Sequence, residues 1–390
     1  MAEAQALVLE RARPLEHEAV LLDVAAGRVL AEAAQAVVDL PPFRSSAMDG
    51  FAVCSEDTPG TLPVVFRIAA GAPARQPLAR GEAMAIATGG VVPEGADAVI
   101  PHEYVGEKDN TVEIGDSVAV GANVRGVGGD VAAGGVVAGA GLRLGPAQIG
   151  ALAAAGLAEV VCSRRPRVAV LTTGTELRAP GSPLGPGEVY EANGVMLAAQ
   201  LASAGGDVTR MAAVSDDEDA HKHALEQGLE HDVLVTSGGI SVGPHDLVRR
   251  IEAELGVEEV FWRVAVRPGK PVSFGVRGLT LVFGLPGNPV SSLVACELFV
   301  RPALLALQGA ADPGPRFAAG TIAVAVTRNP ARDDLLRARS TVADDGVSLE
   351  PVTGQESHMI VRAAEADALV LVPRGEGEIP AGSTVRYLTL

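Results

Sequence analysis

The sequence predicts a multidomain protein with a central α/β domain, a strand-rich inserted domain and a small C-terminal β-barrel. Three observations lead to this fold class. The chain has 390 residues, more than one domain usually holds. Between residues 167 and 311, short apolar runs ending in glycine turns alternate with amphipathic segments, which favours an α/β domain. Residues 41–142 and 312–390 carry short alternating runs between turns, which favours strands.

Four domains follow from these patterns. Residues 1–40 and 143–166 are predicted to form a helical and linker domain, because "LEHEAVLLDVAAGRVLAEA" has helical periodicity and "GPAQIGALAAAGLAEVVC" supplies a second helix. We expect the second helix to pack on the first, which makes residues 41–142 an insertion. Residues 167–311 are predicted to form the α/β domain with a mostly parallel sheet, and residues 312–390 the barrel.

The composition excludes several classes of function. A net charge of −17 argues against nucleic acid as a partner. Cys54, Cys162 and Cys296 lie far apart without metal-ligand spacing, which favours reduced thiols. The N-terminal segment lacks the apolar core of a signal peptide, and Glu297 and Arg301 interrupt the most apolar long segment. We therefore expect a cytoplasmic protein without a membrane partner.

Glycine turns follow three predicted strands of the α/β domain: Thr172-Thr173-Gly174, Ser237-Gly238-Gly239 and Leu285-Pro286-Gly287. In an open α/β sheet, ligands bind outside the carboxyl ends of the strands, where glycines let several backbone N–H groups face one point. The third turn enters a predicted helix at Pro289, with Ser291 in its first turn, and a helix N-terminus favours anions. Single glycine turns are common in α/β proteins, but three at one edge favour a ligand site.

A basic loop and several acids accompany these turns. The segment "WRVAVRPGKPVSF" holds three cations between stiffening prolines, which favours a phosphate or oxyanion site: Arg263, Arg267 and Lys270. Carboxylates lie near the same turns: Glu176, Asp216, Asp217 and Asp246. Acids beside a phosphate site are compatible with binding when Mg²⁺ bridges them to the ligand. His245 is either a titrating group or a surface loop residue.

The stretch "PPFRSSAMDGFAV" raises a separate question. Pro41 and Pro42 make the chain stiff, and small residues then lead to Asp49-Gly50. A surface turn needs only the Asp-Gly pair. The rest of the segment therefore calls for another explanation.

A set of long motifs in fixed order resembles one family. The motifs are "PPFRSSAMDGFAV", "IATGGVVPEGADAVIPHE", "VAVLTTGTEL", "TSGGISVGPHD", "RPGKP", "GLPGNPVSS" and "GQESHM". They resemble the MoeA family of molybdopterin molybdenumtransferases, which is related to the E domain of gephyrin. The resemblance extends from about residue 7 to the C-terminus.

This resemblance implies an elongated homodimer whose active site lies between the α/β domain of one subunit and the strand-rich domain of the other. The implied reaction takes adenylylated molybdopterin and molybdate, inserts the metal into the dithiolene and releases AMP, with Mg²⁺ as the supporting cation. The adenylyltransferase that makes the substrate is a candidate docking partner. Preference between molybdate and tungstate stays open.

The resemblance also assigns roles to residues. It implies catalytic roles for Asp49, Lys270 and Asp216, and makes Asp246 the expected Mg²⁺ ligand. The glycine turns and the family motifs together give the expected substrate-binding residues: Thr88, Asp130, Glu176, Ser237, Gly238, Gly239, Arg263, Arg267, Pro286, Gly287, Asn288, Ser291, Arg337 and Ser357. Arg337 and Ser357 resemble barrel residues that help bind molybdate.

Under this hypothesis the segment "PPFRSSAMDGFAV" is an arm that presents Asp49 to the partner subunit, and the small residues before Asp49 leave room for a bulky ligand. Whether Asp49 acts as a base or positions a metal stays open. The chain departs from many relatives at Phe51, where Tyr is frequent, and at Thr175, where an acid is frequent. Arg263 and Arg267 replace lysines but keep the charge.

Two other functions are compatible with parts of the sequence. An adenylyltransferase that makes the adenylylated pterin would have a similar α/β core, but it would need neither the "PPFRSSAMDG" segment nor the barrel. A scaffold is the third reading, since gephyrin anchors receptors through its E domain. An assay for ATP consumption with metal-free molybdopterin separates the first alternative from the metal-inserting reaction.

Overall fold

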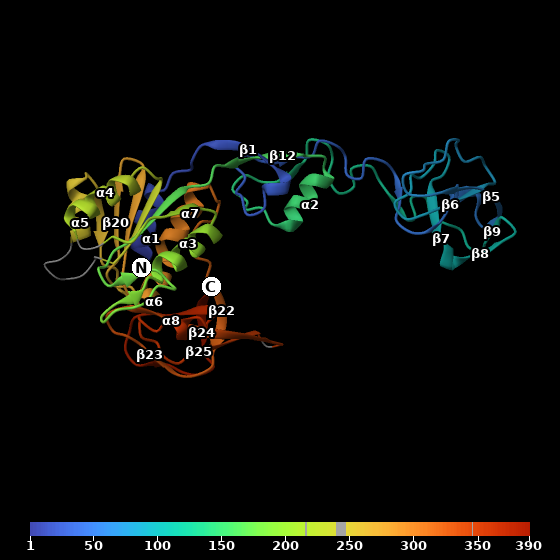
Figure 1. The fold of residues 1–390 in the computed structure, drawn as a ribbon. Coiled ribbons are helices and arrows are strands. Elements are labelled where there is room, and N and C mark those ends of the chain that lie inside the picture. The colour runs from blue at the N-terminus through green and yellow to red at the C-terminus, as the bar shows by residue number, and fades with distance from the viewer. Residues whose placement is uncertain (215–216, 239–246, 345) are drawn as a thin grey trace.

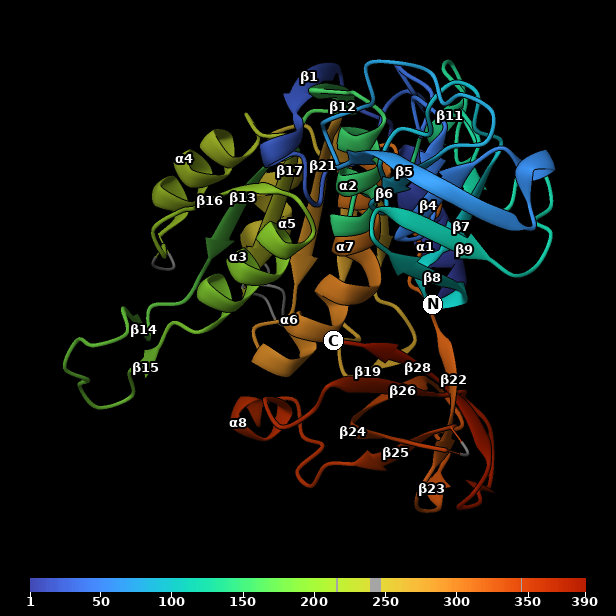
Figure 2. The same cartoon turned by 90° about the vertical axis from the view of Figure 1, so that its right-hand side faces the viewer.

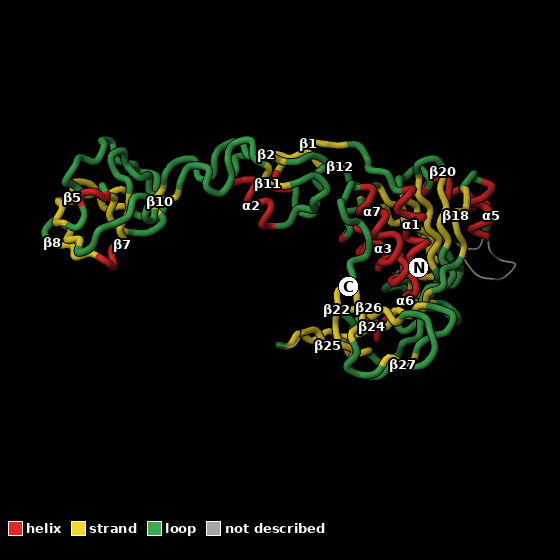
Figure 3. Tube along the Cα trace, turned by 180° about the vertical axis from the view of Figure 1, so that it is seen from behind, coloured by secondary structure: helices red, strands yellow, loops and turns green. Residues whose placement is uncertain are grey.

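A computed structural model of the protein describes residues 1–214, 217–238, 247–344 and 346–390. Three parts follow one another along a line (Figure 1): the α/β domain (helix α1 and residues 167–309), the stem (residues 15–40 and 131–166) and the distal lobe (residues 41–130). The barrel (residues 318–390) lies beside the α/β domain, and the view from behind shows the same order (Figure 3). The predicted multidomain fold class is confirmed.

The α/β domain contains a six-stranded sheet with the order β16-β13-β17-β21-β20-β18. Its first four strands are parallel, and β20 and β18 are antiparallel additions at one side. The strands are β13 (Arg167–Thr172), β16 (Asp207–Arg210), β17 (Val233–Ser237), β18 (Glu258–Trp262), β20 (Ser273–Arg277) and β21 (Thr280–Leu285). The expected mostly parallel sheet is therefore present, as part of a mixed sheet.

Alternate residues of each central strand pack on opposite faces, because side chains alternate along a strand. Val168 and Val170 join the core under helices α1, α3, α6 and α7, whereas Ala169 and Leu171 face α4 and α5. The helices are α1 (Ala2–Arg11), α3 (Asn193–Ser203), α4 (Glu218–Gly228), α5 (Leu247–Glu254), α6 (Pro289–Ala295) and α7 (Arg301–Leu307). Helices thus cover both faces of the sheet, which explains why its strands are apolar on both sides.

One long helix runs from Pro289 to Leu307, with a π-helical turn η4 (Cys296–Val300) between α6 and α7. Pro302 has no N–H to donate to the carbonyl of Leu298, and the side-chain amide of Gln5 donates to that oxygen at 3.2 Å instead. Among the helices that the structure describes, this one alone is long and apolar enough to cross a membrane, and 78% of its most apolar window is buried inside the protein. Its apolar surface therefore belongs to the core of the α/β domain.

Two expectations for the N-terminal region are wrong. Residues 15–33 do not form a helix: they contain the strand β1 (His17–Leu21) and the short 3₁₀ helix η1 (Leu22–Val24). The N-terminal helix α1 contacts α7 and η4 of the α/β domain, so the helix of the stem, α2 (Pro146–Ala154), does not pack on it. Instead, α2 covers a small core of the stem that includes Leu152 and Cys162.

The stem is built on pairs between its two chain segments. Strand β1 pairs antiparallel with β12 (Glu159–Ser163), and β2 (Ala34–Gln35) pairs with β11 (Val136–Ala138). A backbone hydrogen bond of 2.8 Å from Leu40 to Val131 then closes the stem where the distal lobe begins. The chain thus enters and leaves the lobe at neighbouring points, as expected of an inserted domain.

The distal lobe contains a sheet with the order β7-β4-β6-β5-β9-β8. Its strands are β4 (Gly50–Val53), β5 (Gly60–Ile68), β6 (Ala83–Ile86), β7 (Ala98–Pro101), β8 (Val105–Lys108) and β9 (Thr111–Ile114). The short strands β3 (Ser45–Ser46) and β10 (Val124–Arg125) pair at its base, and the 3₁₀ helices η2 (Ser55–Asp57) and η3 (His102–Tyr104) connect strands. The strand-rich prediction for this region is confirmed.

The C-terminal region closes into a barrel through the ring β24-β25-β22-β28-β26, because β26 also pairs with β24. Its elements are β22 (Ala318–Ile322), β24 (Asp333–Ala343), β25 (Gly346–Pro351), α8 (Ile360–Ala363), β26 (Ala368–Val372) and β28 (Thr384–Thr389), with the small pair β23 (Val326–Thr327) and β27 (Glu378–Ile379). Strand β19 (Val266–Arg267) of the α/β domain pairs with β24 and joins the two domains.

Candidate functional site

The three predicted glycine turns lie side by side at the carboxyl edge of the sheet. Thr172, Ser237 and Leu285 end strands β13, β17 and β21, and their registers place them opposite one another. Gly238 has a φ of 98°, and a Cβ there would lie 2.5 Å from the carbonyl oxygen of Thr173. The turns are therefore packed backbone against backbone, which requires glycine at this position.

Sequence reasoning missed Asn193, which connects these turns. Its side-chain amide donates to Ser237 Oγ at 2.9 Å and to the carbonyl oxygen of Gly287 at 2.8 Å. Ser237 is itself buried and donates to the carbonyl oxygen of Pro286 at 3.1 Å. The signal for Asn193 was its position at the start of helix α3, after the loop that carries Glu176, where a polar residue can face the sheet edge.

The predicted acids of this edge are only partly described. Glu176 is exposed, and its carboxylate lies so close to Gly174 that a Cβ there would be 2.7 Å from Oε2. Asp216, Asp246 and Gly239 lie outside the described residues, and so does His245. Among the described residues, no three His, Cys, Asp or Glu side chains gather as a metal cluster. A single exposed carboxylate still fits Mg²⁺, because this ion usually binds one or two carboxylates together with ligand phosphates.

A cleft of about 640 Å³ lies where the α/β domain meets the barrel. It brings together predicted residues from several separate motifs: Arg267, Lys270, Pro286, Asn288, Ser291, Arg337 and Ser357. Lys270 is exposed, whereas Ser291 and Arg337 are buried in the cleft wall. The cleft therefore collects cations and hydroxyl groups, the donors that a tetrahedral anion requires.

Contacts between the domains hold this cleft in shape. The side-chain amide of Asn288 donates to Ser357 Oγ at 2.9 Å, and the N–H of Val290 donates to the carbonyl oxygen of Ser357 at 3.0 Å. Arg267 forms an ion pair with Asp334 of the barrel. Burial raises the pKa of Asp334, although the neighbouring guanidinium opposes that shift. The start of helix α6 and the basic loop are thus both fastened to the barrel.

Arg337 is the most unusual residue of the cleft. Its side chain is fully buried, and burial lowers the pKa of its guanidinium. Nη2 donates to the carbonyl oxygen of Gly354 at 2.9 Å, but Nε and Nη1 have no hydrogen-bond partner among the described residues. The side-chain amide of Gln355 accepts a hydrogen bond of 3.1 Å from the N–H of Arg337 and donates one of 2.8 Å to its carbonyl oxygen. A buried guanidinium with two unbonded nitrogens is costly unless an anion accepts hydrogen bonds from them.

Further cations line a neighbouring cavity of about 460 Å³. Lys270 and Arg332 line both this cavity and the cleft, whereas Arg263 lines only the cavity. Arg263 has a φ of 69° and lies 5.4 Å from the ring of Trp262. Sequence reasoning therefore placed Arg263 correctly beside the basic loop, but it missed Arg332, and also Gln355 and His358 of the cleft. The "GQESHM" motif was the available signal for the last two.

Another cavity, of about 620 Å³, lies between residues 139–143 of the stem and helix α7. Its charged lining includes Arg301, which already pairs with Glu297 at 3.2 Å. Arg143 in the same lining donates to the carbonyl oxygens of Gly27 and Ser203. These cations already have partners, so the cleft at the barrel is the better anion site.

Asp49 lies exposed on the distal lobe and is held by Thr88. Both the N–H and the hydroxyl of Thr88 donate to Asp49 Oδ1, at 2.6 and 2.9 Å. These two hydrogen bonds lower the pKa of Asp49. His102 lies next to this pair, with its N–H 3.1 Å from the carbonyl oxygen of Asp49. Asp49 is therefore a fixed, ionised carboxylate on an open surface.

The small residues before Asp49 have a structural role. Ser45 and Ser46 are buried at the base of the lobe. Contrary to the expectation from the sequence, they therefore leave no room for a ligand. Gly50 is required by close packing, because a Cβ there would lie 1.9 Å from the carbonyl oxygen of Ile100. The predicted residue Asp130 is exposed near the same base, where its N–H donates to Leu40.

Within one chain, the predicted site residues form two separate groups. Asp49 and Thr88 belong to the distal lobe, at one end of the molecule, and the cleft with Lys270 lies beyond the stem at the other end (Figure 1). The end-on view shows the strands β14 (Leu177–Arg178) and β15 (Val189–Tyr190) projecting from the α/β domain (Figure 2). One chain alone does not unite the two groups.

Comparison with known proteins identifies the family. Profiles described as "MoeA N-terminal region (domain I and II)", "Probable molybdopterin binding domain" and "MoeA C-terminal region (domain IV)" match residues 1–156, 169–306 and 319–390. The molybdopterin molybdenumtransferase 2 of Mycobacterium tuberculosis is 36% identical and aligns over 100% of this chain and 98% of its own. This chain belongs to the MoeA family.

Other members agree with this MoeA assignment. The molybdopterin molybdenumtransferase of Haemophilus influenzae is 33% identical over 95% of this chain and 93% of its own. The solved structure of the molybdopterin biosynthesis moeA protein from Pyrococcus horikoshii OT3 has a TM-score of 0.86 at 27% identity, covering 100% of this chain and 99% of that one. The MoeA-type arrangement of domains therefore extends over the whole chain.

Proposed function

We propose that this MoeA-family protein is a molybdopterin molybdenumtransferase, which inserts molybdate into adenylylated molybdopterin and releases AMP. Relatives that carry this name align with the whole chain. The observation that carries the proposal is Arg337, a buried guanidinium in the wall of a cationic cleft, of which two nitrogens have no hydrogen-bond partner among the residues that the structure describes. The chemistry of that cleft suits an oxyanion, because an anion supplies the missing acceptors.

In this proposal molybdate binds in the cleft between the α/β domain and the barrel. Molybdate is a tetrahedral dianion, so it needs cations and hydrogen-bond donors around it. Lys270 and Arg337 provide charge, and Ser291 and Ser357 provide hydroxyl groups. Arg267 is already paired with Asp334, so it serves mainly to hold the loop of Lys270 in place. Tungstate has the same charge and shape and is an alternative oxyanion.

The nucleotide end of the substrate is assigned to the glycine turns. Their backbone approaches closely at Gly238 and Gly287, and backbone N–H groups at such turns bind pyrophosphate. Mg²⁺ would be held by Glu176 together with Asp246. It would neutralise charge on the pyrophosphate while the phosphoanhydride bond to AMP is cleaved. Asn193 fixes the relative positions of two of these turns, which orients the pyrophosphate beside the oxyanion cleft.

Asp49 completes the site only if a second copy supplies it. The distal lobe holds this carboxylate far from the cleft of its own chain (Figure 1). We infer a homodimer in which the lobe of one protomer covers the cleft of the other. The ionised state of Asp49 suits a role in orienting a positively charged group or a water nucleophile. We also expect this reaction to take place in the cytoplasm, where the free thiols stay reduced.

The test is a single-turnover assay with the purified protein, adenylylated molybdopterin, molybdate and Mg²⁺, in which AMP release and metal insertion are both followed. We expect AMP to appear only when oxyanion and divalent cation are present together. Asp49→Asn should fold and bind the pterin but lose metal insertion. ATP consumption with metal-free molybdopterin would instead indicate an adenylyltransferase, and wild-type turnover by Asp49→Asn would contradict the role of the lobe.

A further inference from the structure

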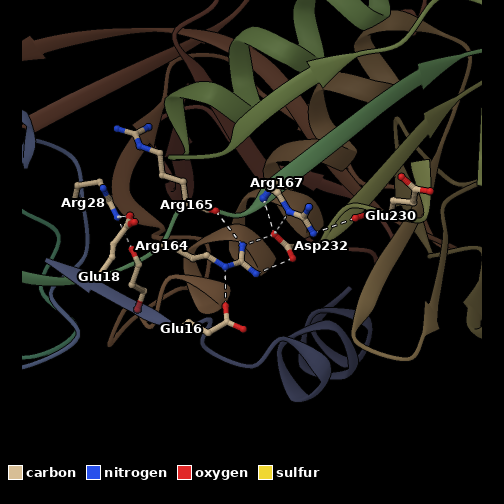
Figure 4. Close-up of polar contacts among 9 residues, drawn as sticks. Glu16, Glu18, Arg28, Arg164, Arg165, Arg167, Glu230 and Asp232 are labelled. Carbon is tan, nitrogen blue, oxygen red and sulfur yellow. Dashed lines mark hydrogen bonds and ion pairs between the residues drawn. The ribbon is translucent and has the colours of Figure 1, made fainter. Parts of the chain in front are cut away.

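Two chain segments connect the α/β domain with the stem within the described residues, 12–16 leaving helix α1 and 164–166 entering strand β13. Two hydrogen bonds of 2.8 Å also join these parts, from Arg143 Nη2 to the carbonyl oxygen of Ser203 and from the N–H of Leu15 to the carbonyl oxygen of Leu307. We call this connection the neck. A cluster of charged side chains lies there (Figure 4). Because the distal lobe is carried on the stem, the orientation of the stem at the neck decides where Asp49 lies.

Arg164 contacts both sides of the neck. Its Nε donates to Glu16 Oε2 at 2.7 Å, on the segment that leads into the stem. Its Nη1 and Nη2 donate to the two carboxylate oxygens of Asp232 at 2.6 and 3.0 Å, and Asp232 directly precedes strand β17 of the sheet. Figure 4 shows the guanidinium between the two carboxylates. A bidentate pair fixes the plane of the guanidinium, and therefore the direction in which Nε points at Glu16.

The α/β side of this contact is rigid. Asp232 is largely buried, with 12% of its side chain exposed, and it also accepts a hydrogen bond of 2.7 Å from the N–H of Arg167. Burial by itself would raise the pKa of Asp232, but bonds from Arg164 and Arg167 outweigh it and leave the pKa lowered. Asp232 therefore stays ionised and anchors Arg164 to the sheet.

The stem side is held more loosely. Glu16 has 77% of its side chain exposed, and its backbone carbonyl accepts a bond of 2.8 Å from the N–H of Arg164. The lowered pKa of Glu16, caused by its own backbone N–H and then by Arg164, keeps this carboxylate ionised as well. The side-chain contact between Glu16 and Arg164 thus adds to this backbone hydrogen bond and to the neighbouring one from the N–H of Leu15 to the carbonyl oxygen of Leu307, at 2.8 Å. Its loss would leave the neck freer to bend.

We propose that Arg164 is a positioning residue for the transferase reaction, acting by fixing the angle of the stem so that the lobe of one protomer presents Asp49 to the cleft of the other. This inference rests on the proposed function, because it assumes a site shared between two copies. A small rotation at the neck is magnified at the far end of the stem, as with any lever. Displacement of a reacting group by about 1 Å can lower a rate by about 100-fold.

The proposal separates binding from turnover. Arg164 lies at the neck and does not line the cleft of Lys270 and Arg337. Changes at the neck should therefore leave oxyanion affinity unchanged while they lower kcat. A residue that only stabilised the fold would instead lower binding, turnover and melting temperature together.

The experiment compares Glu16→Gln and Arg164→Gln with the control Arg67→Gln in the full-length protein. The control removes an exposed ion pair between Arg67 and Glu107 that lies within the lobe. Spin labels on Asp116→Cys of the lobe and Glu226→Cys of helix α4, with Cys54→Ser to prevent side labelling, report the orientation of the lobe by pulsed electron paramagnetic resonance. Calorimetry with molybdate and single-turnover AMP release complete the set.

We expect broader label-to-label distance distributions in both neck variants, kcat lowered by about tenfold or more, and molybdate affinity within twofold of the wild type. Arg164→Lys should recover part of kcat, because a lysine reaches one carboxylate but not both. Glu16→Gln leaves the Arg164–Asp232 pair intact, so it remains informative if Arg164→Gln fails to fold.

Unchanged distance distributions in Glu16→Gln and Arg164→Gln would overturn the proposal, and so would broadened distributions with unchanged kcat. Failure of the proposed function gives a different result, because the wild-type protein itself would then release no AMP. In that case broadened distance distributions in the neck variants would still show that Arg164 fixes the orientation of the stem. Distributions as narrow as those of the wild type would refute that role.

Discussion

At the scale of single residues, the candidate site rests on two side chains whose arrangement folding alone does not explain. Arg337 is buried, yet only one of its three guanidinium nitrogens has a hydrogen-bond partner in the described part of the chain, and Asp49 is exposed yet held in one orientation by Thr88. Both arrangements are unfavourable or unnecessary for folding by itself. Under the proposed function they become useful, because an anion would fill the cleft and a partner group would meet the carboxylate.

Replacing Arg337 by Met should separate stability from binding. Charge-assisted hydrogen bonds contribute about 1.5–3 kcal/mol each, so loss of two should weaken molybdate binding by at least about 100-fold. The melting temperature should stay equal or rise, because a buried charge without an anion opposes folding. Calorimetry and thermal unfolding measure the two effects. The control is Arg339→Met, an exposed residue of the same strand, and a large fall in melting temperature for Arg337→Met would show a structural role instead.

Thr88→Val should shift the pH dependence of turnover. Hydrogen bonds from Thr88 hold the pKa of Asp49 below its ordinary value, so the carboxylate keeps its charge until the pH falls through that lowered value. Valine removes the hydroxyl donor but not the backbone N–H, and the pKa of Asp49 should rise toward its usual range. The acidic limb of the kcat profile should therefore move to higher pH. An unmoved limb would mean that ionised Asp49 is not required.

At the scale of elements, strand β4 shows how closely the distal lobe is packed. It lies between β6 and β7, and Gly50 faces the backbone of Ile100. The Asp-Gly pair of the sequence is thus explained from both sides. The aspartate belongs to the candidate site, and the glycine belongs to the sheet that carries it.

Gly50→Ala should destabilise the lobe by about 1–3 kcal/mol or more, because a Cβ would lie 1.9 Å from the carbonyl oxygen of Ile100. The matched control is Gly106→Ala in strand β8, where the nearest atom would be 4.0 Å away. The one tryptophan, Trp262, lies in the α/β domain, so hydrogen exchange of the lobe amides should follow the change. Equal exchange rates in both variants would contradict this packing argument.

Prediction of these elements succeeded where local pattern and tertiary role agree. Strand β17 is buried on both faces and ends in a glycine turn, so its sequence "DVLVTSGG" suffices to identify it. Strand β1 was mistaken for part of a helix, because the leucines and valines of residues 15–33 fit a helical period. Its strand state depends on β12, more than a hundred residues later. Local sequence does not contain that pairing.

At the scale of the whole molecule, the candidate site is divided between two distant parts. The sequence placed Lys270, Ser291, Arg337 and Ser357 in one anion site, and the cleft brings them together. It did not reveal Asn193 or Arg332, because their roles depend on how turns and domains meet in space. Asp216 and Asp246 lie outside the described residues, so their expected roles remain predictions.

A mixture of two inactive variants tests this division. Asp49→Asn and Lys270→Gln each remove one half of the site, but a mixed dimer contains one site with both halves intact. After random exchange of subunits, about a quarter of wild-type AMP release should return. Each variant alone supplies the control. A mixture that stays inactive, although mixed dimers are detected by mass, would place both residues in the same chain's site.

The hydrogen bond from Leu40 to Val131 has a consequence for engineering. Since both ends of the lobe emerge there, the entire segment can be exchanged between relatives as a cassette, without rethreading any other strand. Chimaeras made at this boundary would show which module determines the preference for molybdenum or tungsten. The choice lies between the retained cationic cleft and the exchanged distal lobe.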